Sequence, residues 1–294
     1  MNKVVMSLAA LMISAAPAFA ADMPVKAMKA PVAAPSPWDV AFGTAFTTDY
    51  NLRGVSQSNY KPAVQGYFEV DYTATDWVKF YAGIWGSSVW TGLANAEFDL
   101  TAGARFTFGN FGLDVGYINY QYPGGAINNF GNYGEVYAKP SYKFNDWLAV
   151  GGVFEYGLGD YNGKLCNGAC LIVPTNIWVG DAVHYFYSGN ATVTLPQWMP
   201  WGITTSINGE VGYEYYSSGV NANLGFSSDT YWDVGLIFNL KAVTLDLRYW
   251  DTNLRNPTAT SGAQCLNAGN GLTNYCSSRF VATLKFDTTW SALK

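Results

Sequence analysis

The chain has 294 residues, of which 17% are aromatic and only 13% are charged. Soluble domains usually carry about 25% charged residues, so this composition argues against an ordinary soluble domain and favours a surface that meets lipid. The formal net charge of −5 and the absence of a basic run give no support for nucleic-acid binding.

The N-terminus has the pattern of a secretory signal. Lys3 precedes an apolar run at residues 4–16, and AFA at residues 18–20 is an A-x-A cleavage site. The apolar run is shorter than the roughly 20 residues that a transmembrane helix needs, so a retained helix is disfavoured. We therefore predict a cleaved signal peptide at residues 1–20 and an Ala- and Pro-rich periplasmic lead-in at residues 21–37.

Segments that alternate between apolar and polar residues follow one another to the end of the chain. The first begins at Trp38, and its aromatic face continues through Phe46 to Tyr50. The clearest, at residues 96–108, is apolar at every even position and polar or small at every odd one. A period of two residues predicts strands whose two faces meet different surroundings. The other predicted strands cover residues 63–73, 77–86, 111–120, 133–144, 147–156, 183–195, 202–215, 230–240, 243–251 and 279–287.

These segments predict an all-β fold, a transmembrane antiparallel β-barrel of about 12 strands that occupies residues 38–290. The connections alternate between short and long, as in bacterial barrels with short periplasmic turns and long extracellular loops. Both termini then lie in the periplasm. A soluble β-sandwich explains neither this alternation nor the apolar face on every strand.

Aromatic residues gather at the ends of the predicted strands, as they do at the two interfaces of a membrane barrel. Those beside the short turns, which predict a periplasmic girdle, are Trp77, Phe108, Phe111, Phe144, Trp147, Trp198 and Trp201. Those expected toward the outer rim are Tyr50, Tyr120, Tyr156 and Tyr215.

One motif resembles a known family. The run DYNLRGVSQS at residues 49–58, followed by PAVQG at residues 62–66, resembles the opening signature of the TorF-type porins. The likeness extends more loosely over the mature chain, which has the same rhythm of hairpins. This resemblance implies an outer-membrane barrel and a channel, and it implies no established substrate.

The polar faces of the strands predict the interior of the barrel. The predicted pore-lining residues are Asp49, Arg53, Gln65, Glu69, Asp71, Lys79, Glu97, Asp99, Arg105, Asp114, Glu135, Lys139, Glu210, Asp233, Asp246, Arg248 and Arg279. The same alternation directs Glu155, Lys143, Lys285, Tyr81, Trp85, Tyr133, Tyr137 and Tyr231 inward. The charges either pair to fill a polar interior or set an ion preference, and their mild acid excess favours cations. The aromatic residues either form a constriction or stacking surface or simply fill volume.

Arg53 has two interpretations. If the alternation of the first strand holds past Tyr50, then Asp49, Asn51 and Arg53 point inward near the outer mouth, and residues 54–58 make the first outer turn. Arg53 then either shapes the channel entrance or pairs with inward acids to hold the first hairpin.

The four cysteines are Cys166, Cys170, Cys265 and Cys276. Their spacing favours the pairs Cys166–Cys170 and Cys265–Cys276, and an exported protein can oxidise them. A metal site is disfavoured because the spacings are not C-x-x-C and His184 is the sole histidine. We expect neither a metal nor a cofactor.

The sequence therefore favours a porin-like channel of the Gram-negative outer membrane, through which small solutes or ions diffuse passively. Its expected partners are outer-membrane lipid and those solutes. A structural or adhesive barrel without transport is the alternative. An outer-membrane hydrolase is disfavoured, because no motif frames His184 and acid pairs such as Glu97 with Asp99 follow from any inward polar stripe.

Overall fold

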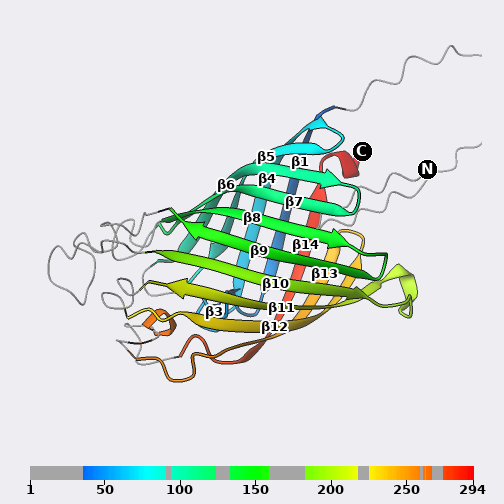
Figure 1. Cartoon of the computed structure of the whole chain (residues 1–294). Helices are drawn as coiled ribbons and strands as arrows, with labels where there is room; N and C mark the ends of the chain where they lie inside the picture. The colour runs from blue at the N-terminus through cyan, green and yellow to red at the C-terminus, as the bar shows by residue number, and fades with distance from the viewer. Residues whose placement is uncertain are drawn as a thin grey trace, which may run out of the picture.

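The computed structural model describes residues 36–90, 94–123, 133–158, 183–217, 225–258, 261, 263–266 and 274–294. Within these ranges, twelve strands form one closed antiparallel barrel (Figure 1). They are β1 (Trp38–Thr47), β4 (Ala63–Thr75), β5 (Val78–Ser88), β6 (Ala96–Phe108), β7 (Phe111–Gln121), β8 (Tyr133–Lys143), β9 (Leu148–Gly157), β10 (His184–Thr194), β11 (Thr204–Tyr216), β12 (Asp229–Leu240), β13 (Val243–Thr252) and β14 (Arg279–Thr289). The predicted barrel and its strand count are confirmed.

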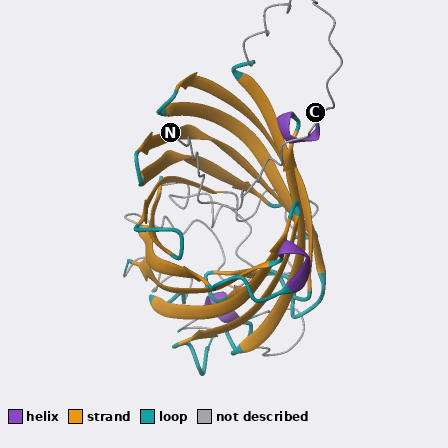
Figure 2. Ribbon diagram, turned by 90° about the vertical axis from the view of Figure 1, so that its right-hand side faces the viewer, coloured by secondary structure: helices purple, strands orange, loops and turns teal. Residues whose placement is uncertain are grey.

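Each strand pairs with its neighbours in sequence, and β1 closes the ring by pairing with both β4 and β14. In this seam Phe42 lies opposite Phe68 on one side and Thr288 on the other. Figure 2 looks at the ring from the end that carries the short turns. Among the twelve described barrel strands, closure leaves no sheet edge unpaired, which is how a barrel satisfies its backbone polar groups.

The connections alternate in length as predicted. Short turns at residues 76–77, 109–110, 144–147 and 241–242 lie at the same end of the barrel as the start of β1 and the end of β14 (Figure 1). The fifth connection at this end, residues 195–203, is longer and holds the 3-10 turn η1 (Pro200–Gly202). The strand ends that the long connections join lie at the opposite end, which we call the outer mouth (Figure 1).

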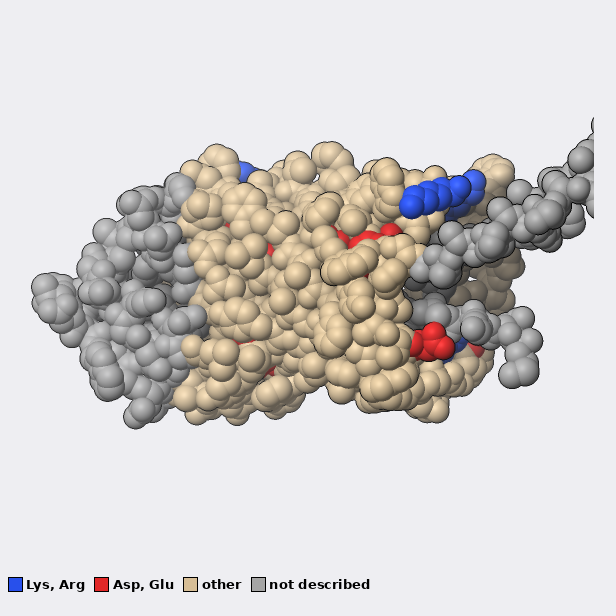
Figure 3. Space-filling view, turned by 90° about the horizontal axis from the view of Figure 1, so that it is seen from above, with Lys and Arg blue, Asp and Glu red and all other residues tan. Residues whose placement is uncertain are grey.

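The outer wall of the barrel is apolar. Leu100 in the middle of β6 is 50% exposed, and Trp201 beside a short turn is 83% exposed. Figure 3 shows few charged side chains on one side of the wall. Among the described residues, no helix has the length and apolar character needed to cross a bilayer.

Two of the tyrosines expected at the outer rim lie inside the barrel instead. Tyr50 and Tyr120 are buried, and their hydroxyls donate to Glu97 (3.0 Å) and Glu135 (3.0 Å). Tyr120 lies at the outer end of β7 as expected, but the parity of this strand directs its side chain inward. Tyr50 is inside because β1 ends at Thr47, so the alternation of the first strand stops before it.

The chain after β1 does not continue the wall. Residues 51–56 form a separate two-stranded hairpin of β2 (Asn51–Leu52) and β3 (Val55–Ser56), which folds into the barrel. We call it the inserted hairpin. Arg53 points into the barrel from the tip of this hairpin, and not from an extended first strand as expected. The predicted signal peptide, nearly all of the lead-in, Cys166 and Cys170 lie outside the described residues.

Candidate functional site

Charged side chains occupy the inner face of the barrel wall. On β6, the outward Phe98 and Leu100 are exposed, whereas the inward Glu97 and Asp99 are buried. Glu135 on β8 is also fully buried. Acids at such depth require hydrogen-bond or ion-pair partners, and Glu135 finds its ion-pair partner in a cation that reaches the interior.

The inserted hairpin carries one of these cations at its tip. Arg53 and Gly54 form the turn with φ values of 48° and 85°, and the Asn51 side chain accepts a 2.9 Å hydrogen bond from the Gly54 N–H. Positive φ at both central residues is the geometry of a type I′ turn. Only glycine fits at position 54, because a Cβ there would collide with Thr252 and lie 2.8 Å from the Cβ of Tyr231. The tip thus rests against β12 and β13.

The base of the hairpin is fixed by Asp49. One carboxylate oxygen accepts hydrogen bonds from Ser56 and from Ser58 (2.8 Å), and the other lies 3.1 Å from Arg279 Nη1 on β14. Tyr50 follows and donates to Glu97. Burial, with the nearby Glu97 carboxyl, raises the pKa of the Tyr50 phenol well above its usual value, so it remains a donor.

At the tip, the Arg53 guanidinium meets three glutamates from three strands. Its Nη2 lies 2.7 Å from Glu135 and in contact with Glu155, and its Nη1 lies 2.8 Å from Glu214. The Phe186 ring centroid is 4.6 Å from its central carbon. We call this group, with His184, the Arg53 cluster. The inserted hairpin therefore bridges the interior from the β1–β4 side to the wall formed by β8–β11.

The Arg53 cluster is buried, and the acids and the guanidinium keep one another charged. Burial alone would lower the pKa of Arg53, but Glu135, Glu155 and Glu214 raise it well above its usual value, so it stays charged. His184 Nε2 lies 2.8 Å from Glu135 and 3.3 Å from Glu214, where an imidazole N–H can donate. These contacts offset the cost of burying the three acids.

Two further arginines organise other parts of the wall. Arg105 binds Glu69 in bidentate fashion at 2.6 and 2.8 Å and lies 3.2 Å from Asp114. Its guanidinium carbon also lies 3.9 Å from the centroid of the ring of Tyr81, a residue of β5. Asp71 completes this group, which we call the Arg105 cluster, by pairing with Lys79 at 3.3 Å.

Arg248 on β13 forms the third group, the Arg248 cluster. It pairs with Asp233 and, at 3.1 Å, with Asp246, and it donates a 2.9 Å hydrogen bond to Asn208. The cluster borders a cavity of about 360 Å³ at the base of the inserted hairpin. Strands β1, β4, β5 and β11 to β14 contribute to the cavity wall.

The structure thus sorts the predicted residues into groups. Arg53 and Glu135 belong to the Arg53 cluster, and Lys139 pairs with Glu155 of that cluster. The Arg105 cluster contains Glu69, Asp71, Lys79, Arg105 and Asp114. The Arg248 cluster contains Asp233, Asp246 and Arg248. Asp49, Gln65 and Glu210 line the cavity, Arg279 holds Asp49, and Glu97 and Asp99 lie apart near Tyr50.

Glu155, Glu214 and His184, which contact Arg53 or its acids, were not among the predicted pore-lining residues. Strand parity directs Glu155 inward, and Glu214 has the same parity as the inward Glu210 on its strand, but nothing local shows that Arg53 reaches them. His184 lacks a sequence motif, yet it lies between Glu135 and Glu214. Charged inward positions at similar depth on neighbouring strands are the signal that could have grouped them.

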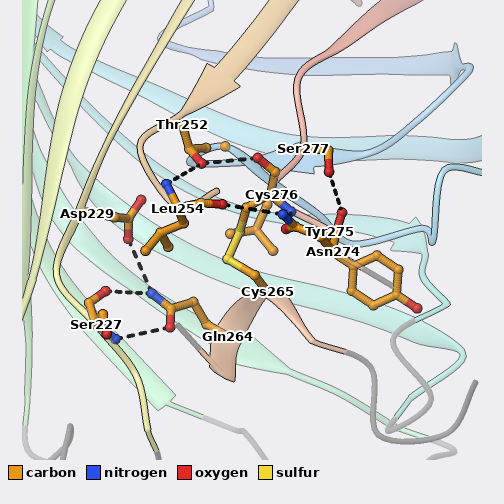
Figure 4. Close-up of a disulfide and its surroundings, with 12 residues drawn as sticks. Ser227, Asp229, Thr252, Leu254, Gln264, Cys265, Asn274, Tyr275, Cys276 and Ser277 are labelled. Atoms are coloured by element: carbon orange, nitrogen blue, oxygen red, sulfur yellow. Dashed lines mark hydrogen bonds between the residues drawn. A yellow bond between two sulfur atoms is a disulfide. The ribbon is translucent and has the colours of Figure 1, made fainter. Parts of the chain in front are cut away.

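A disulfide joins Cys265 and Cys276 in the connection between β13 and β14, as predicted (Figure 4). Thr252 donates to the Cys276 carbonyl at 3.1 Å, and the neighbouring Tyr275 carbonyl accepts the Ser56 N–H at 2.9 Å. The disulfide-bonded loop therefore supports the inserted hairpin from its outer side.

Alkylation should reveal this disulfide. When the denatured protein is treated with iodoacetamide without reductant, we expect Cys265 and Cys276 to stay unmodified and to be recovered as one linked peptide by mass spectrometry. Reduction should lower the stability of the barrel by about 2–4 kcal/mol, because the disulfide restricts the unfolded chain. Complete alkylation of both residues without reductant contradicts the pairing.

Comparisons with solved structures find other β-barrels. The KdgM porin has 10% identity and a TM-score of 0.44, covering 84% of this chain and 98% of that one. An outer membrane channel from Pseudomonas putida F1 has 13% identity and a TM-score of 0.45, covering 88% and 97%. The NanC porin has 11% identity and a TM-score of 0.44, covering 85% and 98%. These likenesses concern the barrel fold.

Sequence comparisons add one match. The model of a family described as "Bacterial protein of unknown function (Gcw_chp)" matches residues 32–283. A search of curated protein sequences finds no match.

Proposed function

We propose that this chain, which belongs to the Gcw_chp family of bacterial proteins, is a porin-like channel of the outer membrane through which small solutes or ions diffuse passively. The proposal includes export by a cleaved signal at residues 1–20, a periplasmic lead-in, and the relationship to TorF-type porins that residues 49–66 suggest. It assigns the chain no enzymatic activity.

A polar cavity enclosed by a wall with an apolar exterior carries the proposal. An apolar band facing outward suits lipid, and a charged inner face suits water. A barrel of twelve strands lies between small barrels filled by side chains and wide porins, so it has room for a narrow passage. The inserted hairpin and the Arg53 cluster narrow that passage near the outer mouth.

Ion preference should be weak. Arg248 pairs with Asp233 and Asp246, and Arg279 pairs with Asp49, so most charges at the cavity are already compensated. Small excess charge attracts few counter-ions. We therefore propose a slight preference for cations rather than strong selectivity.

Planar-bilayer recording tests the function. Purified, folded protein is expected to give discrete conductance steps of small size, with a reversal potential in a KCl gradient that shows only slight cation preference. Folding is checked separately by the change in gel mobility on heating. The second candidate, a structural barrel without transport, is favoured by the hairpin that occupies the outer mouth. A silent bilayer from folded protein would establish that candidate and contradict the channel.

A further inference from the structure

We propose that the cavity at the base of the inserted hairpin is a binding site for a small neutral saccharide. This inference rests on the proposed function, because the cavity lies inside the barrel where a diffusing solute would pass. Its volume of about 360 Å³ is at the lower end of the roughly 300–1,000 Å³ range of small-molecule sites. A ligand the size of a mono- or disaccharide suits that space.

The polar groups at the cavity are of mixed type. Glu210 offers a carboxylate that accepts from the Tyr231 hydroxyl, while Lys285 offers donors, and Gln65 offers both kinds of group. A hydroxyl also both donates and accepts, so a polyhydroxylated ligand can use all of these groups. A simple ion of either sign would meet repulsion from part of the wall, because acids and bases share it.

One donor at the cavity has no partner. The Asn51 side chain lines the cavity, and its Oδ1 accepts from the Gly54 N–H. Its Nδ2 is buried and makes no hydrogen bond within the described structure. A buried donor left unpaired is costly, and a ligand oxygen at the cavity wall can satisfy it after a small adjustment.

Two indole rings complete the site. Trp85 from β5 and Trp250 from β13 both line the cavity and are half-buried. They come from opposite sides of the β1 seam, since β4 separates β5 from β1 and β14 separates β13 from it. The C–H groups on a sugar ring form an apolar surface that packs on an indole, and the indole N–H can donate to a hydroxyl. Aromatic side chains beside mixed donors and acceptors favour a sugar over an inorganic ion.

Titration calorimetry on the folded full chain tests this site without any current measurement. The detergent must be sugar-free, so we choose lauryldimethylamine oxide. The probes are glucose, galactose, maltose, lactose and sucrose, with galacturonate as an anionic and choline as a cationic comparison. We expect at least one neutral sugar to bind, and to bind more tightly than either charged probe.

Matched tryptophan variants locate the binding. Trp250→Leu is expected to raise the Kd of that sugar about tenfold through loss of a ring-face contact, and Trp85→Leu should act in the same direction. Trp232→Leu is the control, because Trp232 lies on the adjacent strand β12 but is exposed on the outer wall. Gel mobility on heating confirms that each variant is folded.

The outcomes separate this site from the channel proposal. The saccharide site is wrong if none of the five sugars binds, if galacturonate or choline binds more tightly than all of them, or if Trp250→Leu and Trp85→Leu both leave the Kd unchanged. A barrel that binds sugar but carries no current contradicts the channel alone. A conducting barrel that binds no sugar contradicts the saccharide site alone.

Discussion

Arg53→Ala is expected to raise the single-channel conductance several-fold and to destabilise the barrel. The variant leaves Glu135, Glu155 and Glu214 facing one another in a buried space without the guanidinium that holds them. Removing one partner of a buried ion pair costs about 3–5 kcal/mol, since the remaining charge stays desolvated. The hairpin also loses its attachment to β8–β11, so it no longer narrows the passage.

Single-channel recording and thermal melting measure the two effects. Arg255→Ala is the matched control, because Arg255 is 61% exposed and pairs with Asp251 at 2.8 Å. The Arg255 guanidinium is largely in water, and Asp251 keeps a 2.8 Å hydrogen bond from the Thr252 N–H. This variant should therefore lose far less stability than Arg53→Ala and should conduct like the unchanged protein. Adding Glu135→Gln to Arg53→Ala should recover part of the stability while the conductance remains high. Normal conductance and ion selectivity in Arg53→Ala would show that Arg53 does not shape the entrance.

Gly54→Ala is expected to displace the inserted hairpin. A φ of 85° is unfavourable for alanine by about 1–2 kcal/mol, and the new Cβ would also collide with Thr252 and press on Tyr231. The collision adds to the backbone cost because both neighbours belong to the barrel wall. We therefore expect a lower melting temperature and a higher, noisier conductance.

Gly109→Ala separates the backbone cost from the collision. Gly109, in the turn between β6 and β7, has a φ of 59°, but an added Cβ there would meet no atom within 4 Å. This variant should show a small loss of melting temperature and an unchanged conductance. Equal effects of the two substitutions on both measurements would mean that the contact of Gly54 with Thr252 and Tyr231 does not position the hairpin.

The wall of the barrel was predictable from local pattern. The strand predicted at residues 96–108 has the same bounds as β6, because each of its residues meets either the apolar outside or the polar inside. Apart from the first strand, the other predicted strands differ from the observed ones by one or two residues at their ends, where pairing gives way to turns. Period-two alternation specifies such strands, because a shift of the pairing by one residue would move every side chain to the opposite face of the sheet.

The inserted hairpin was not predictable in this way. Alternation through Tyr50 suggested one continuous strand, whereas the wall ends at Thr47 and the chain turns inward. What draws it inward is the set of partners of Arg53, and those lie 82, 102 and 161 residues further along the chain. A pattern within one segment carries no information about contacts at such distances, so the composition of the Arg53 cluster required the structure.

These distances along the chain also bear on the order of folding. Arg53 gains its last carboxylate only when β11 has joined the sheet, and β1 is sealed only when β14 arrives. Contacts between remote segments form slowly, because the intervening chain must first lose its freedom. Before that point a buried guanidinium would lack part of its counter-charge, so we expect the hairpin to dock only when most of the wall exists. We therefore expect the narrowing of the mouth to be among the last steps of assembly, after β11 has joined the sheet.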